Sequence, residues 1–168
     1  METRSMSRPS FIITSDAVAE KRGQYPNSDE LLGFTRCIGQ AAGLLRIGIN
    51  LVRLPPGHRA SWPHAEEKEE ELVYVLEGTV DAWVDGAVYP MTRGDFAAFP
   101  AGTGICHTFI NNSDTEATLL VGGEADKADN RIYYPLHPQR EGDMPASGWW
   151  HDIPKRAQGP NDARPVPR

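Results

Sequence analysis

The chain has 168 residues, of which 39% are hydrophobic and 24% charged, the composition of an ordinary globular domain. Seventeen basic against 23 acidic residues give a net charge of −6, which argues against a surface that binds nucleic-acid phosphates. The first ten residues lack the apolar stretch of a signal peptide, and no segment approaches the length of a membrane span. Two cysteines are too few for a disulfide framework. We therefore expect a cytoplasmic protein without nucleic-acid or membrane partners.

The first 35 residues are predicted to form an N-terminal extension with a short strand at 10–14 and a helical turn around 28–32. The 16 glycines and 14 prolines indicate many turns, as an all-β chain requires. Residues 45–52 alternate in hydrophobicity with period two, which predicts a strand that ends before Pro55 and Pro56.

Short strands separated by Gly, Pro and Asp follow this first strand. Their expected ranges are 71–77, 80–84, 87–91, 96–99, 105–110 and 117–121. Asp85-Gly86 is a typical hairpin turn, and Trp83, in alternation with Asp81 and Asp85, is expected at the surface. The spacing is typical of a β-sandwich or barrel, which we expect to occupy residues 36–124.

Residues 125–168 form a C-terminal arm, rich in proline and charge. Its aromatic side chains, Tyr133, Tyr134, Trp149 and Trp150, are unusual for a disordered tail. We therefore expect them to be at least partly buried against the barrel or a second subunit. The last ten or so residues are expected to bury nothing and to be flexible.

Two segments carry a resemblance to a known family. Residues 57–78 read GHRASWPHAEEKEEELVYVLEG, and residues 94–111 read GDFAAFPAGTGICHTFIN. They are similar to the two motifs of the cupin family, G(X)5HXH(X)3-4E(X)6G and G(X)5PXG(X)2H(X)3N. The resemblance implies a double-stranded β-helix, the jelly-roll barrel of cupins. It does not select an activity, because cupins include dioxygenases, isomerases, lyases, storage proteins and sensors.

The motif register implies the metal ligands. Aligned on Gly78, the first motif places its glutamate at Glu71 and its paired histidines at His64 and Glu66, so that the usual HXH is His-Ala-Glu. The second motif places its histidine at His107, two residues further from its last glycine than in the family pattern. The resemblance therefore implies a divalent ion held by His64, Glu71 and His107.

Strand parity supports this assignment independently. Glu71 and His107 each lie in an inward-facing row of apolar residues, and burying either side chain without a partner costs several kcal/mol. Two histidines and one carboxylate suit Fe, Mn, Zn or Ni. Glu66 opens an acidic run, a pattern usually exposed to solvent. It is therefore left open as a fourth ligand or a general base.

The leading functional hypothesis is a metal-dependent enzyme acting on a small polar molecule, of oxygenase, isomerase or lyase type. The alternative is a non-catalytic cupin that binds or senses a small molecule. With Glu71 facing the pocket, Leu72, Tyr74 and Leu76 form an outward apolar stripe, which predicts a homodimer.

Overall fold

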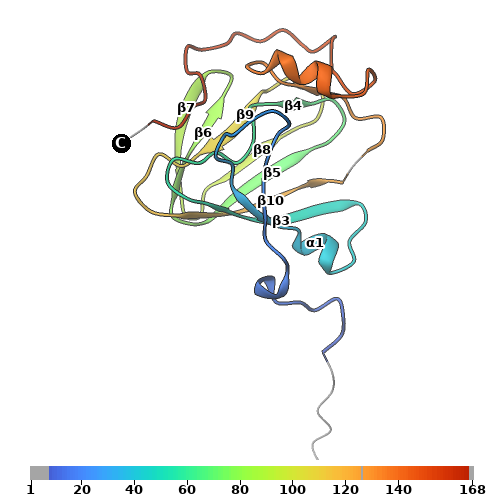
Figure 1. Ribbon diagram of the computed structural model, residues 1–168, viewed down its shortest axis with the longest axis vertical. Coiled ribbons are helices and arrows are strands. Elements are labelled where there is room, and N and C mark those ends of the chain that lie inside the picture. The colour runs from blue at the N-terminus through green and yellow to red at the C-terminus, as the bar shows by residue number, and fades with distance from the viewer. Residues whose placement is uncertain (1–7, 126, 167–168) are drawn as a thin grey trace, which may run out of the picture.

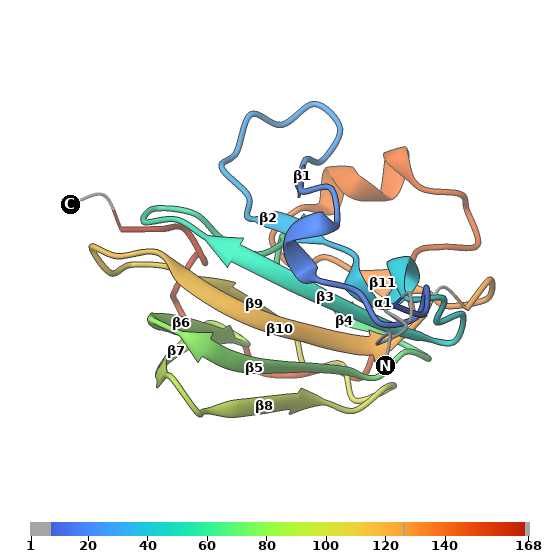
Figure 2. The same cartoon turned by 90° about the horizontal axis from the view of Figure 1, so that it is seen from below.

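Two antiparallel β-sheets face each other in a computed structural model that describes residues 8–125 and 127–166. The larger sheet has the order β1-β2-β3-β10-β5-β8, formed by Lys21–Arg22, Phe34–Arg36, Ile47–Leu54, Ala117–Glu124, Glu71–Glu77 and Phe96–Phe99. The smaller sheet, β7-β6-β9, comprises Ala87–Thr92, Thr79–Val84 and His107–Ile110. Figure 2 shows the two sheets from their edges, with β8 at the free edge of the larger one. The predicted all-β jelly roll is confirmed.

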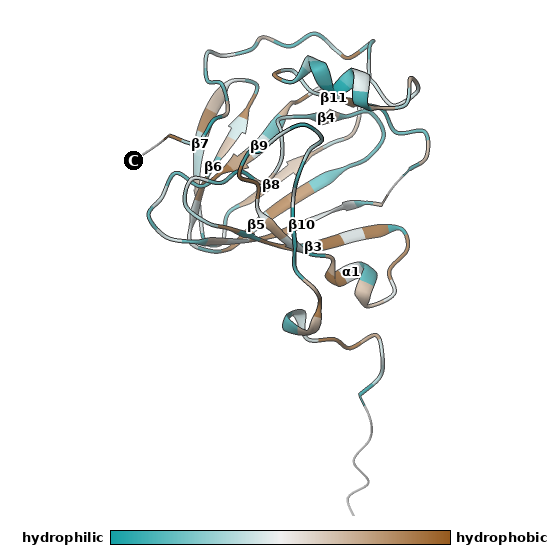
Figure 3. Cartoon of the chain, viewed as in Figure 1, coloured by the Kyte–Doolittle hydropathy of each residue, from teal (hydrophilic) through white to brown (hydrophobic). Residues whose placement is uncertain are grey.

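A short two-stranded sheet joins the barrel to the arm. Its strands are β4 (Ala65–Glu66) and β11 (Ile132–Tyr133). The helical elements are brief: η1 (Ser15–Ala17), α1 (Ile38–Ala41) and η2 (Pro138–Asp143). In the described residues, none of them is long and apolar enough to cross a membrane. The arm passes over the barrel with η2 on its outside (Figure 1), and Figure 3 shows that η2 is largely hydrophilic.

Inward-facing residues of both sheets make the main core. Its buried members are Val52, Leu54, Val73, Val75, Val80, Ala82, Phe99, Phe109, Ala117 and Leu119. Val73 and Val75 are buried while Tyr74 between them is exposed, as the strand alternation predicts. The hairpin at Asp85-Gly86 has positive φ at both residues, 48° and 83°, which is the backbone of the tight turn expected there.

The predictions of a strand and a helical turn in the N-terminal extension are wrong. Residues 10–14 form a turn and coil instead of a strand, and 28–32 contain no helical turn; the first α-helix lies at Ile38–Ala41. A strand at 10–14 would need a neighbouring strand to pair with, and in the described residues the larger sheet begins at β1, which pairs with β2. Local hydrophobicity cannot supply that partner.

The arm packs on the barrel. Trp149 and Trp150 are buried, as is Tyr134, while Tyr133 is half-buried, which confirms the prediction for the aromatic residues. Trp150 lies in a second cluster with Trp83, which is fully buried. The expectation that Trp83 is a surface residue is therefore wrong.

The described end of the chain covers Trp83 and also differs from expectation. The backbone oxygen of Asn161 accepts a hydrogen bond from Trp83 Nε1 at 2.8 Å, and Ala163 is fully buried. Arg59, 2% exposed, donates to the Ala163 carbonyl oxygen at 3.2 Å and pairs with Glu30. The segment therefore buries side chains on the barrel, contrary to the expectation that it buries nothing.

Candidate metal centre

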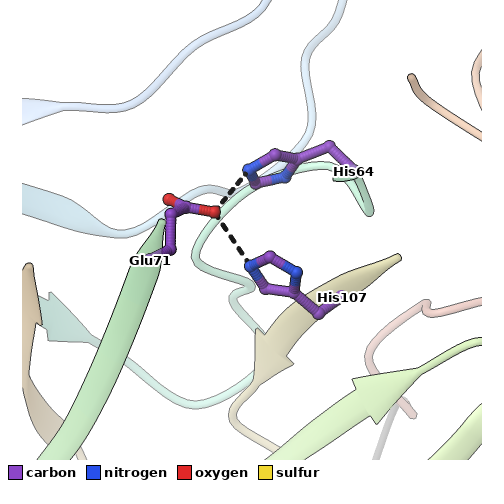
Figure 4. A group of neighbouring side chains, drawn as sticks. All are labelled: His64, Glu71 and His107. Atoms are coloured by element: carbon purple, nitrogen blue, oxygen red, sulfur yellow. Dashed lines mark ion pairs between the residues drawn. The ribbon is translucent and has the colours of Figure 1, made fainter. Parts of the chain in front are cut away.

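Three side chains from different elements meet inside the barrel. Glu71 begins β5, His107 begins β9, and His64 immediately precedes β4. Glu71 Oε2 lies 3.2 Å from His64 Nε2 and 3.0 Å from His107 Nε2, and one ligand atom of each residue lies within 4.8 Å of the others. Figure 4 shows the glutamate pointing at both rings. The structure thus brings together the three residues selected by the motif register.

In His64 and His107, the hydrogen bond made by Nδ1 determines whether Nε2 faces Glu71 with a hydrogen or with a lone pair. His64 Nδ1 lies 2.8 Å from the carbonyl oxygen of Trp62, and His107 Nδ1 lies 3.4 Å from that of Ile105. A carbonyl oxygen only accepts, so each neutral imidazole carries its hydrogen on Nδ1 and turns the Nε2 lone pair toward Glu71. This is the orientation in which metal-binding histidines are held.

When both rings are neutral, the buried Glu71 Oε2 has no hydrogen-bond donor, because the two nitrogens at 3.2 and 3.0 Å then present lone pairs to it. Two Nε2 lone pairs and one carboxylate oxygen therefore converge on one point. An orphaned buried acceptor costs free energy unless something compensates it. A divalent cation fits this donor set, because imidazole nitrogen and carboxylate oxygen are both common ligands of Zn and Fe.

In the absence of an ion, a proton on His64 partly compensates the buried charge of Glu71. Burial lowers the pKa of His64, but the Glu71 carboxylate outweighs it and raises that pKa to about 9. Burial lowers the pKa of His107. Burial opposes ionisation of Glu71, yet the two imidazoles hold its pKa well below the usual range. The charged pair His64–Glu71 thus occupies the place where a cation would bind.

Glu66 lies beside this group. Its side chain is 12% exposed, and Oε1 is 3.9 Å from His64 Nε2, so it faces inward despite its place in an acidic run. Burial, followed by repulsion from Glu71, raises the pKa of Glu66 to about 7. A divalent ion would relieve this repulsion between two carboxylates.

Aromatic rings form the wall behind the centre. The Phe99 ring stacks on His107 with centroids 3.5 Å apart, and Tyr134 of the arm lies 5.8 Å from the His64 ring. The free space in front of the group is about 10 Å³, lined by residues that include Glu69, Pro100, Thr103 and Ile105. That is room for about one water molecule.

Other histidines lie outside the centre. His137 is buried beside Arg59, whose guanidinium lies 3.0 Å from His137 Nε2, and its ring stacks on Trp62. Trp62 is therefore a packing residue, 3% exposed. His151 is exposed and lies 3.6 Å from Glu141. Among the described residues, neither His137 nor His151 belongs to a group of side chains that could hold a metal ion.

Comparison with known proteins agrees with the fold described above. The sequence model of the Cupin domain family matches residues 50–123. A sugar phosphate isomerase from a cupin superfamily, from Silicibacter pomeroyi, is 36% identical with a TM-score of 0.69, covering 73% of this chain and 80% of that one. The chain belongs to the cupin superfamily.

Other solved structures are similar to this cupin. One is a protein from Acidithiobacillus ferrooxidans that is provisionally described as a sugar phosphate isomerase. It is 27% identical with a TM-score of 0.67, and the match covers 75% of this chain and 81% of that one. A polyketide cyclase from Streptomyces resistomycificus has a TM-score of 0.61 at 20% identity, covering 86% and 99%, which shows the shared fold alone. A search of curated protein sequences found no significant match.

Sequence reasoning missed one residue of the site. Asn130, in the arm, donates from Nδ2 to Glu66 Oε2 at 3.1 Å. It lies 64 residues from its partner and outside both cupin motifs, so no local pattern marks it.

Proposed function

We propose that this cupin is a metal-dependent enzyme that acts on a small, oxygen-rich molecule, with isomerisation of a sugar phosphate as the first reaction to test. The observation that carries the proposal is the convergence of two Nε2 lone pairs and the orphaned Glu71 Oε2 on one point. The named activity of the Silicibacter pomeroyi protein favours the isomerase type among the three types that the sequence leaves open.

His64, Glu71 and His107 would hold the ion, with Glu66 as the fourth ligand. Two carboxylates would neutralise a divalent charge, and Glu66 Oε1 already faces the group from 3.9 Å. The ion would act as a Lewis acid on a substrate oxygen. Phe99 and the core behind it exclude water from the far side of the centre. A substrate would have to displace part of the wall that includes Glu69 and Thr103, because the space beside the group is small.

The direct test combines metal loading with a substrate panel. Chelator-treated protein is incubated with Mn²⁺, Fe²⁺, Zn²⁺ or Ni²⁺ and then with aldose and ketose phosphates, and products are followed by proton NMR. Turnover that needs the metal supports the proposal. Metal and sugar phosphate binding without turnover would favour the alternative, a non-catalytic binding cupin. Protein that stays empty under excess of all four metals would contradict the metal centre itself.

Metal binding is expected to stabilise the fold. An ion that binds only the native state at 100 times its Kd adds about 2.7 kcal/mol to the free energy of unfolding. For a domain of this size, that raises Tm by roughly 5–10 °C. Differential scanning calorimetry of the chelator-treated protein with and without Mn²⁺ measures the shift. An unchanged Tm in the presence of a demonstrated excess would contradict the expected site.

We also propose a homodimer that buries the outer face of β5. Tyr74 is 38% exposed there, and its partner in the ladder, Phe96 on β8, is 58% exposed. Exposed apolar patches of this kind mark interfaces. Light scattering at micromolar concentration is expected to give a dimer, and Phe96→Glu a monomer. Tyr89→Glu, at an equally exposed site on β7, is the control and should remain dimeric. A monomeric wild type would rule out this interface.

A further inference from the structure

The acidic run beside the metal centre is held by the beginning of the arm. Arg131 donates to both carboxylate oxygens of Glu67, at 2.6 and 2.7 Å, and Glu67 N donates to the Arg131 carbonyl oxygen at 2.9 Å. Lys68 pairs with Asp129. The run is therefore not simply solvated, because residues 127–131 lie along it and bond Glu67, Lys68 and Glu69.

Asn130 is the member of this segment that reaches the centre. Its Oδ1 accepts from the backbone N–H of Lys68 at 3.0 Å, and this group can only donate. The orientation of the amide is thereby determined, so that Nδ2, the donor, faces Glu66 Oε2 at 3.1 Å. The ladder between β4 and β11 pairs Glu66 with Ile132, two residues beyond Asn130, which fixes the register of this contact.

The same contact decides where the rest of the Glu66 carboxylate points. With Oε2 bonded to Asn130, Oε1 is left facing His64 Nε2. Glu66 and Glu71 repel one another, so an unrestrained Glu66 side chain would turn toward solvent. A hydrogen-bond donor on the outer oxygen opposes this rotation.

We propose that Asn130 is a positioning residue of the metal centre, which holds one oxygen of Glu66 so that the other faces the ion. This inference rests on the proposed function, in which Glu66 is the fourth ligand. It also makes the arm part of the centre, although Asn130 lies outside the residues 50–123 that match the Cupin domain. Partners that orient metal ligands typically contribute about 10–100-fold to metal affinity.

The test measures Mn²⁺ affinity by competition with a chelator in a double-mutant cycle. Asn130→Ala is expected to weaken binding at least about tenfold. In a Glu66→Ala background, the same substitution is expected to change affinity less than about twofold, because its effect passes through Glu66. Asp129→Asn is the matched control. It removes the neighbouring ion pair with Lys68, leaves Glu66 untouched, and should bind Mn²⁺ as the wild type does.

Each outcome has a distinct meaning. An equal loss in both backgrounds would show that Asn130 only supports the fold, and no loss would show that it does not position Glu66; either result overturns the inference. If Glu66→Ala alone leaves affinity intact, the fourth ligand and the role of Asn130 fail together, while a three-ligand centre survives. A wild type that does not bind Mn²⁺ overturns this inference, and the other metals of the panel then decide the proposed function. If Asn130→Ala lowers Tm, Asn130→Leu, similar in volume and without a donor, replaces it.

Discussion

Replacing His107 by alanine is expected to remove most of the divalent-metal binding. The ring is buried and stacked on Phe99, and its Nε2 is one of the two nitrogens aimed at Glu71 Oε2. Among the described residues, no other histidine shares the group with His64. Because even an outer partner of a ligand contributes about 10–100-fold, loss of the ligand itself should weaken binding by on the order of 100-fold or more. Competition with a chromogenic chelator measures the affinity.

His151→Ala is the matched control for this substitution. His151 is exposed in the arm and contacts only Glu141 among the ion pairs of the described residues, so its removal should leave metal affinity unchanged. Because the alanine at 107 leaves a void beside Phe99, His107→Gln, which keeps most of the volume, separates loss of the ligand from loss of packing. Full metal occupancy in the His107→Ala protein would refute the assignment of the centre.

Trp150→Ala is expected to lower the free energy of unfolding by about 3–5 kcal/mol. Trp150 is 3% exposed and packs in a cluster with Trp83, Cys106 and Ile110 of the barrel. The same cluster contains Ala65, which separates His64 from Glu66. Loss of the indole therefore removes buried apolar area and leaves a cavity in the cluster that contains Ala65, the residue between two of the proposed ligands. Urea unfolding monitored by circular dichroism measures the change.

Tyr89→Ala is the comparison for the tryptophan. Tyr89 is 56% exposed on β7, and a substitution at such a surface site usually changes stability by no more than about 0.5 kcal/mol. Removal of the whole arm after residue 126 should lower Tm by several degrees at least, because it removes Trp149 and Trp150 together. A loss below about 1 kcal/mol for Trp150→Ala would mean that the arm does not pack on the barrel in solution.

The amino-acid sequence by itself determined most strands of the two facing sheets, though not β1 and β2, and selected three members of the candidate centre. Period-two alternation and turn residues such as Asp85-Gly86 are local signals, so the ranges of β5 and β8 are those expected. The same alternation predicts that Glu71 faces inward, and the spacing of the two motifs selects His64 and His107. These inferences depend on patterns among residues that lie close together in the chain, and such patterns are visible in a single sequence.

Only the tertiary structure decided what surrounds that centre. Glu66 belongs to a run of acidic residues, a pattern that predicts exposure to solvent. It faces inward because Asn130, 64 residues away, donates a hydrogen bond to its outer oxygen. Trp83 alternates with aspartates and would be exposed on an isolated sheet, but the segment around Asn161 covers it. Both outcomes depend on where the arm folds back onto the barrel. That contact is made between distant parts of the chain, and its free energy comes from burial that no local pattern records.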